Sequence, residues 1–149
     1  MKVTFDTNIF ISRKITPADF PGGFYLSAVV LQELVAGAPD EASVKAFGAM
    51  RTVFEKKNHI LVPLLEDWWQ AGRVLNSLQR GRRSPVTGQI PKISVEERLR
   101  ITNDVLLARI ARREGVVVVT DNTGDFDKIR PLCAAKTLSG EDYFGTPPN

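Results

Sequence analysis

The chain has 149 residues, of which 43% are hydrophobic and 25% are charged. This balance is that of an ordinary soluble globular domain and excludes a disordered or collagen-like chain. The single cysteine, Cys133, excludes an internal disulfide and a multi-cysteine metal site, so we expect a small buried side chain there. The longest uncharged stretch, residues 20–32, is too short to span a membrane, and Asp6 precedes any apolar run long enough for a signal peptide. These features favour a cytoplasmic protein.

Short strand-like runs alternate with helix-like segments, so we expect one α/β domain, residues 1–149, built on a mostly parallel sheet. The expected strands lie at residues 2–5, 24–26, 60–62 and 116–119, and a last strand includes residues 137–138. The expected helices lie at residues 9–11, 29–35, from Asp40 or Ser43 to 57, 64–78 and, as one helix or two, 94–113. Residues 145–149 are expected to fray.

Local signals indicate where several of these elements begin and end. Ser27 is expected to cap the second helix, and Ser94 with Glu97 forms a capping-box pattern before the long helix. Glycine and proline interrupt the periodicity over residues 80–93, which predicts an inserted loop longer than most connections. In the helix before that loop, Trp68, Leu75 and Leu78 are the expected core positions. We expect the Trp68–Trp69 pair to serve packing and a partner surface rather than base stacking.

The net charge of +3 is unevenly distributed along the chain. Between Arg80 and Glu114, nine basic residues stand against four acidic ones, so this segment carries +5 and the remainder −2. A basic segment near carboxylates is expected where a polyanion is drawn toward an acidic, metal-loaded site. The same pattern is also consistent with a solvated helix face beside loop arginines.

Acidic residues occupy positions where a parallel sheet binds its ligands. Asp6 directly follows the first expected strand, and the loop at residues 121–125 follows the fourth, beyond the carboxyl ends of both. Glu33 and Asp104 lie inside otherwise apolar helical patterns. Clustered carboxylates disfavour one another's ionisation and usually require cations. Oxygen ligands suit Mg²⁺ or Mn²⁺, and a chain with one histidine, His59, and one cysteine is a poor zinc binder; we expect His59 to be structural or on the surface.

Four blocks in chain order carry a resemblance to a known family. They are Asp6-Thr7-Asn8, Gln32-Glu33-Leu34, Asn103-Asp104, and Thr120-x-Asn122-x-x-Asp125-Phe126. With them, nearly the whole chain resembles a PIN domain, and within that family it is most similar to VapC-type toxins of type II toxin–antitoxin systems. The resemblance implies an α/β/α sandwich with a mostly parallel central sheet. It also implies a Mg²⁺- or Mn²⁺-dependent endoribonuclease that hydrolyses RNA with a cation-activated water and is inhibited by a cognate antitoxin.

The resemblance also assigns roles to individual residues. Asp6, Glu33 and Asp104 match the three principal acids of the family, and Asp125 is our choice for the fourth catalytic and metal-binding carboxylate, with Asp121 and Asn122 as the alternatives. Residues expected to orient ligands or waters around them are Thr7, Asn8, Thr120, Asp121 and Asn122. Residues of the basic loop expected to hold the RNA backbone are Arg80, Arg82, Arg83 and Lys92.

Partners and competing functions follow from the same comparison. A homodimer is expected, and an amphipathic antitoxin helix is expected in an apolar groove formed by the helices at residues 29–35 and 44–54. Two alternatives stay open: a non-catalytic RNA-binding or antitoxin-docking module, and a DNA-directed nuclease of the same architecture, since neither carboxylates nor arginines distinguish ribose from deoxyribose. A haloacid dehalogenase-like phosphohydrolase fits less well because Asn8 stands where that class needs a second aspartate, and a receiver-like phosphoacceptor lacks its acidic pair.

Overall fold

The computed structural model describes residues 1–146, and its centre is a set of short parallel strands. Strands β1 (Val3–Phe5), β4 (Val117–Val119) and β5 (Thr137–Leu138) pair in that order, with Val3 opposite Val117 and Val118 opposite Thr137. Strands β2 (Leu26–Ser27) and β3 (Ile60–Leu61) form a second parallel pair. A parallel bridge between Val3 and Phe24 joins the three-stranded sheet to this pair, which gives the strand order β3-β2-β1-β4-β5. The predicted α/β class with a parallel sheet is therefore confirmed.

Helices surround these strands, and most begin at a capping residue. Their bounds are α1 (Thr7–Ser12), the 3-10 turn η1 (Pro17–Asp19), α2 (Ala28–Ala36), α3 (Glu41–Lys56), α4 (Leu65–Gly81), α5 (Val95–Glu114), α6 (Thr123–Ile129) and α7 (Gly140–Phe144). Ser27, Asp40 and Ser94 accept a backbone N–H at the starts of α2, α3 and α5, as their sequence positions predict. Helix α5 is a single continuous helix, and it ends where Gly115 adopts a left-handed conformation with φ of 66°.

The core is built on β1 and on aromatic side chains brought together from both ends of the chain. Phe5 is fully buried, and its ring centroid lies 4.8 Å from that of Phe24 and 5.2 Å from that of Phe144. Phe20 and Phe54 extend this cluster toward α3. The packing fixes the carboxyl end of β1 against α7, and so it fixes the position of the loop that follows β1.

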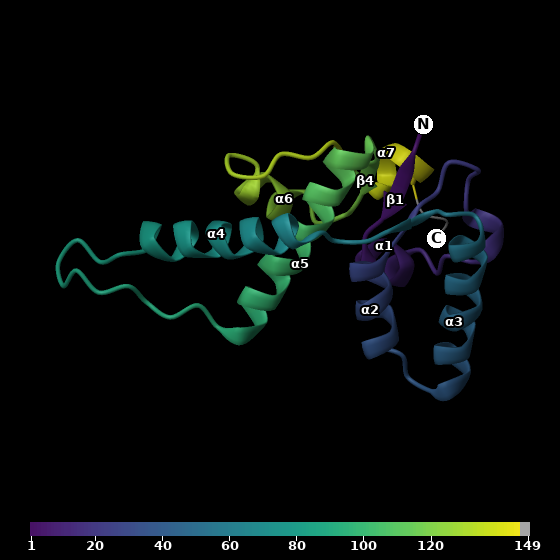
Figure 1. Cartoon of the computed structure of the whole chain (residues 1–149), viewed down its shortest axis with the longest axis horizontal. Coiled ribbons are helices and arrows are strands. Elements are labelled where there is room, and N and C mark those ends of the chain that lie inside the picture. Colours follow the sequence, from purple (N-terminus) through teal and green to yellow (C-terminus); the bar gives the residue numbers. More distant parts are fainter. Residues whose placement is uncertain (147–149) are drawn as a thin grey trace.

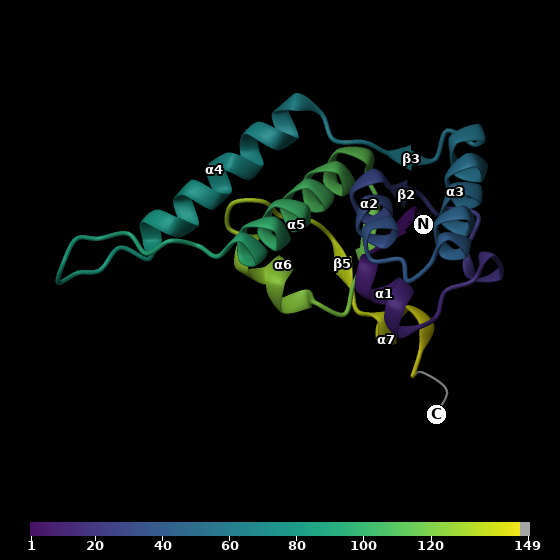
Figure 2. The same ribbon diagram turned by 90° about the horizontal axis from the view of Figure 1, so that it is seen from below.

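Helix α4 packs along α5, and its carboxyl end extends beyond the body of the protein. Figures 1 and 2 show the end of α4 and the following segment projecting away from the other elements. The helix continues to Gly81, three residues past the expected end, so Arg80 is helical. Within the loop, the Ser84 amide donates to the Gln89 carbonyl at 2.8 Å, which closes an ordered turn. We call the carboxyl end of α4 together with residues 82–94 the arm.

The expected core positions of α4 are partly wrong. Of the three expected positions, Trp68 is 53% exposed, and Leu75 and Leu78 are half-buried. The buried positions are Asp67, Ala71 and Val74. The inward face is therefore turned by one residue from the one that the apolar pattern favours. The reason is an ion-pair partner for Asp67 on α5, described below.

Two expectations concern single residues, and one concerns the C-terminal tail. Cys133 is buried, and the His59 ring stacks on Tyr25 while its Nδ1 lies 3.0 Å from the Phe24 carbonyl oxygen, so both residues are structural. Of the tail expected to fray, residues 147–149 lie outside the described part of the chain. Gly145, however, is held: its amide donates to Glu141 and its carbonyl accepts from Arg13. Within residues 1–146, no helix is both long enough and apolar enough to cross a membrane.

Candidate active site

Asp6 is placed by the junction of β1 and α1. It directly follows the strand and caps α1, with Oδ1 accepting the Thr7 amide at 2.8 Å. Its Oδ2 accepts the Thr120 hydroxyl at 2.8 Å and the Asn8 side-chain amide at 3.0 Å. The side chain is only 7% exposed. Both carboxylate oxygens are therefore oriented by donors, as a preorganised ligand requires.

Thr120 and Asn8 join the loops that follow β1 and β4. The Thr120 hydroxyl, which donates to Asp6, accepts from the Asn8 side chain at 3.2 Å and from the Asn122 amide at 3.0 Å. Asn8 Oδ1 in turn accepts the Asp121 amide at 3.0 Å. This network crosses from one strand end to the other, so the polar residues after both strands form one unit.

Four carboxylates from different elements lie close enough to act on one another's charge. Burial raises the pKa of Asp104 on α5 to about 8. The negative charges of Asp6, Asp125 and Glu33 add to this increase, while Arg100 opposes it. Burial also raises the pKa of Glu33 on α2, and the charge of Asp6 raises it further. Burial likewise raises the pKa of Asp6, against the hydrogen bonds that this carboxylate accepts.

Asp125 enters this cluster from α6 and has basic neighbours. Arg100 Nε lies 3.6 Å from one of its oxygens, and Lys128 Nζ lies 3.9 Å from the other. A cleft of about 190 Å³ has Asp104, Asp125 and both cations in its wall. Arg100 also borders a second hollow of about 330 Å³, which reaches Glu33. Sequence reasoning missed Arg100 as a site residue, although its place one helical turn before Asp104 puts it on the same face of α5.

Asp121, the alternative acid in the loop after β4, forms structural hydrogen bonds outside the acidic cluster. Its Oδ1 accepts the Gly140 amide at 2.9 Å and its Oδ2 accepts the Ser12 hydroxyl at 3.3 Å. The carboxylate therefore holds the start of α7 against α1. Asn122 precedes α6 and donates its backbone amide to Thr120. Of the three candidates for the fourth acid, Asp125 is the one whose charge raises the pKa of Asp104.

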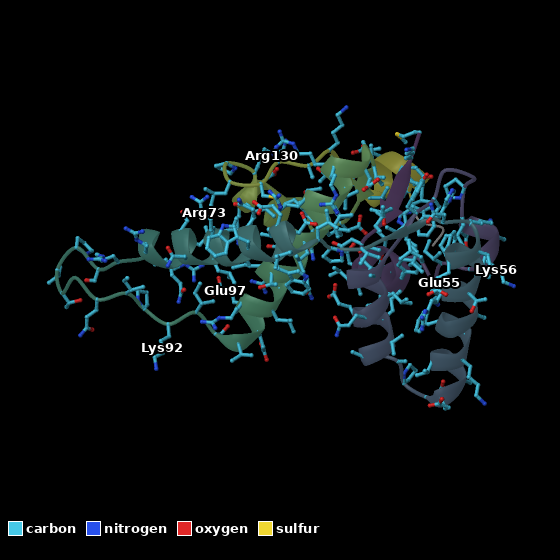
Figure 3. All side chains as sticks on the ribbon, in the orientation of Figure 1. Glu55, Lys56, Arg73, Lys92, Glu97 and Arg130 are labelled. Atoms are coloured by element: carbon cyan, nitrogen blue, oxygen red, sulfur yellow. The ribbon has the colours of Figure 1, made fainter. Side chains whose placement is uncertain are left out.

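The four basic residues expected to bind RNA do not form a single patch. Arg80 and Arg83 line one hollow on α4. Arg82 turns to the other side of the helix and donates to Glu97 at 3.0 Å. Lys92 is exposed on the returning segment of the arm, and Figure 3 shows it pointing away from Arg73, which lies on the opposite side of α4.

A buried ion-pair group that sequence reasoning did not find holds α4 to α5. Asp67 is fully buried, and it accepts from Arg109 Nε at 3.1 Å and from Arg113 at 2.6 Å. Its Oδ2 also accepts the Leu64 amide at 2.8 Å. Burial acts to raise the pKa of Asp67, but the Leu64 amide and the two guanidinium groups outweigh it, and the pKa lies below its usual range. This group sets the position of the helix that carries Asp104.

The residues of the acidic cluster suit a divalent cation in their chemistry. Four carboxylates supply the hard oxygen ligands that Mg²⁺ and Mn²⁺ prefer, and a cation would relieve the repulsion that raises the pKa of Asp104. The Thr7 hydroxyl is buried beside the Glu33 carboxylate, and its interaction with that group opposes the rise that burial causes in the pKa of Glu33. Within the same residues, no three acidic, histidine or cysteine side chains stand close enough to enclose a metal ion. The donor set therefore fits the ion, although its side chains are spaced more widely than in a closed metal site.

Comparison with known proteins places the fold. No family model and no curated protein matches the sequence. Among solved structures, VapBC-1 from nontypeable Haemophilus influenzae is 21% identical, with a TM-score of 0.57 and coverage of 93% of this chain and 98% of that chain. VapBC2 from Rickettsia felis, bound to a DNA fragment from its promoter, is 18% identical, and DNA-bound VapBC from Salmonella typhimurium is 19% identical; both have a TM-score of 0.55 and the same coverage. The chain therefore shares its fold with these VapBC structures, which agrees with the fold that the resemblance of its motifs implies.

Proposed function

We propose that this protein is a metal-dependent endoribonuclease that acts as the toxin of a type II toxin–antitoxin pair in the cytoplasm. The observation that carries the proposal is the cluster of Asp6, Glu33, Asp104 and Asp125, which comes from four elements around the carboxyl ends of β1 and β4. In a protein without a bound cation such a cluster lowers stability, because burial and like charge both disfavour ionisation of the carboxyl groups. The fold shared with VapBC supports the toxin assignment.

The four carboxylates would hold Mg²⁺ or Mn²⁺. A divalent cation bound there would activate water and stabilise the incoming and departing oxygens of a phosphodiester. Asp6 is kept in one orientation by its hydrogen bonds to Thr7, Asn8 and Thr120. Asp104 takes up a proton most readily, since burial and like charge raise its pKa to about 8. It therefore releases this proton when positive charge enters the cluster.

Cations beside the acids bring the RNA to them. Arg100 and Lys128 pair with Asp125 and face the same cleft, so their charges attract a phosphate toward the acidic cluster. We propose that basic residues farther out also contact the RNA backbone, although they lie on different sides of the arm and one of them, Arg82, is paired with Glu97. These residues are Arg80, Arg82, Arg83 and Lys92. Contacts of this kind position the backbone without reading sequence.

An apolar groove beside α3 is our candidate for the antitoxin. Its volume is about 500 Å³, and Phe47, Met50 and Val53 of α3 face Ile15 and Phe20 across it. Helix α2, expected from sequence to form one wall, contributes no residue to this groove because the segment before β2 takes its place. An amphipathic helix with large apolar side chains fits such a surface. A homodimer remains part of the proposal, in keeping with the family resemblance.

The test is cleavage of a mixed pool of structured and unstructured RNAs by purified protein free of any bound partner. We expect discrete products with Mg²⁺ or Mn²⁺, none with EDTA, and none from Asp104→Asn. Equal cleavage by wild type and variant would show that a contaminant cuts the RNA. Absence of cleavage by a folded wild-type protein would favour the non-catalytic docking module, and equal cleavage of a matched DNA would favour the DNA-directed nuclease.

A further inference from the structure

One face of α4 carries a hollow that the acidic cluster does not use. The hollow has a volume of about 860 Å³, and Trp69, Arg73, Asn76 and Arg80 line it at intervals of four, three and four residues. This spacing places them in one row along the helix. Arg83, just beyond the helix end, continues the row. We call this surface the α4 hollow.

The arginines of the α4 hollow are free to bind a ligand. Arg73, Arg80 and Arg83 form no ion pair with any side chain of residues 1–146. No acidic residue lines the hollow. Arg82, one residue away, shows the contrast, because it is paired with Glu97. The hollow therefore gathers three positive charges without a compensating negative one, which suits a polyanion.

Trp69 adds a flat apolar surface to these charges. Its side chain is 64% exposed, which leaves much of the indole open to solvent at the end of the row. Arg73 and Arg80 are seven residues apart, about 10 Å along a helix, so the two guanidinium groups can contact different phosphates of one strand. Guanidinium groups in line with an exposed aromatic ring are the combination by which proteins bind single-stranded nucleic acid, the ring stacking on a base.

Gly72 lines the α4 hollow and, having no side chain, leaves its volume open. A glycine inside an exposed helix costs about 1 kcal/mol relative to alanine. Packing does not require this one, because a Cβ built on Gly72 meets no atom within 4 Å. Gly72 lines the hollow between Trp69 and Arg73, so a side chain there would project into it.

We infer that the α4 hollow is a binding site for single-stranded RNA, separate from the acidic cleft. Trp69 stacks on a base, and Arg73, Arg80 and Arg83 hold the phosphates that follow. The cleft with Asp104 is bordered by Leu78 and Arg82, which belong to the other face of α4, and the two hollows share no residue. The choice of RNA rests on the proposed function; the site itself rests on the hollow.

The experiment measures binding without cleavage. Fluorescence anisotropy with the full-length protein, in EDTA, follows a labelled single-stranded RNA of about 12 nucleotides, a length near that of known single-strand sites. We expect Trp69→Ala to weaken binding by at least about fivefold. Trp68→Ala is the matched control, since Trp68 is similarly exposed but lies outside the hollow. Equal effects of the two substitutions would overturn the inference.

Charge variants test the phosphate contacts independently. We expect the double variant Arg73→Gln with Arg80→Gln to reduce the slope of log K against log salt by about 1.4, because each single-strand contact contributes about 0.7. The control removes two arginines elsewhere, Arg51→Gln with Arg130→Gln, and leaves the slope unchanged. An unchanged slope in the first variant, or an equal decrease in the control, would contradict the inference.

A third pair of variants keeps the test open if Trp69→Ala fails to fold. Gly72→Glu places a carboxylate in the hollow and is expected to weaken RNA binding at least about fivefold. Gly48→Glu is the matched control, because Gly48 is also an exposed helical glycine with no atom within 4 Å of its Cβ position. Tighter binding of a duplex than of the single strand would overturn the inference. If the wild-type protein binds the RNA but does not cleave it with Mg²⁺, the proposed function is contradicted, while the inference that the α4 hollow binds RNA is not.

Discussion

Asp104 has the most strongly shifted pKa of the four clustered carboxylates. Its pKa is raised to about 8, and the first cause is burial. The folded protein without metal therefore keeps a proton on this group up to about pH 8, whereas the unfolded chain releases it near 3.8. The stability that the protonated group gives is complete below about pH 4 and is lost as pH rises toward 8. A pKa shifted this far by burial and like charge is what the proposed role of Asp104 in a metal-binding cluster predicts.

The first prediction is that Asp104→Asn makes the metal-free protein less sensitive to pH. In EDTA, the free energy of unfolding of the wild type falls between pH 5.5 and 7.5, and Asp104 contributes at most about 1.4 kcal/mol per pH unit. We expect the variant to show a shallower fall and to be the more stable protein at pH 7.5. Urea unfolding at several pH values measures both quantities. Asp127→Asn, an exposed position on α6, is the control, and an equal change in slope would contradict the prediction.

At the scale of elements, α4 and α5 are held together by one buried carboxylate. Asp67 contacts Arg109 and Arg113, whose side chains are 28% and 32% exposed. Apolar periodicity does not reveal such a position, because the side chain that faces inward is charged and its partners lie more than 40 residues along the chain. The inward face of α4 predicted from the apolar pattern is therefore wrong by one residue, and Trp68 was assigned to the core.

The second prediction concerns this ion pair. We expect Asp67→Ala to lower the free energy of unfolding by about 3 kcal/mol, because two partly buried guanidinium groups lose their counter-charge. Glu66→Ala is the matched control one residue earlier, where the carboxylate is exposed and contacts Gln70. That control is expected to change stability by less than about 0.5 kcal/mol. Denaturant unfolding of both variants measures the difference, and equal losses would show that the buried pair does not hold the helices.

Element ends set by local chemistry were predictable, and elements set by distant contacts were not. Ser27 and Ser94 cap their helices as predicted, since a cap depends on residues two or three positions away. The short helices α6 and α7 have no apolar periodicity of useful length and were missed. Helix α7 does have a local cap, the Ser139 hydroxyl that accepts the Asp142 amide at 3.0 Å, but it spans only five residues. Its first residue, Gly140, is also held by Asp121, a contact across 19 residues that the sequence pattern does not contain.

The third prediction tests this contact. A Cβ added at Gly140 would lie 2.6 Å from Asp121 Oδ1, 2.8 Å from Arg13 Nε and 3.0 Å from Ile9 Cδ1. We expect Gly140→Ala to destabilise the protein by about 1–3 kcal/mol, as overpacking does. Gly124→Ala, in helix α6, is the control, because its Cβ would meet no atom within 4 Å. A thermal unfolding midpoint that falls equally in both variants, or in neither, would contradict the prediction.

At the scale of the whole molecule, the four clustered carboxylates and the arginines of the α4 hollow lie in different parts of the protein. The acids converge around the ends of β1 and β4. Helix α4, whose residues line the α4 hollow, projects away from the other elements in Figure 1. The positions of Asp6, Glu33 and Asp104 could be predicted because a family motif surrounds each of them. The α4 hollow could not, because it depends on which face of α4 points outward, and that face is set by Asp67.

The central claim is that the carboxylate cluster cleaves RNA, and two residues on one helix test it most directly. Asp125 belongs to the cluster, whereas Asp127 is exposed and pairs with Arg130. In one assay with Mg²⁺, we expect Asp125→Asn to abolish cleavage and Asp127→Asn to cleave at the wild-type rate, with both variants folded. Wild-type cleavage by Asp125→Asn, or equal loss in both variants, would contradict the account.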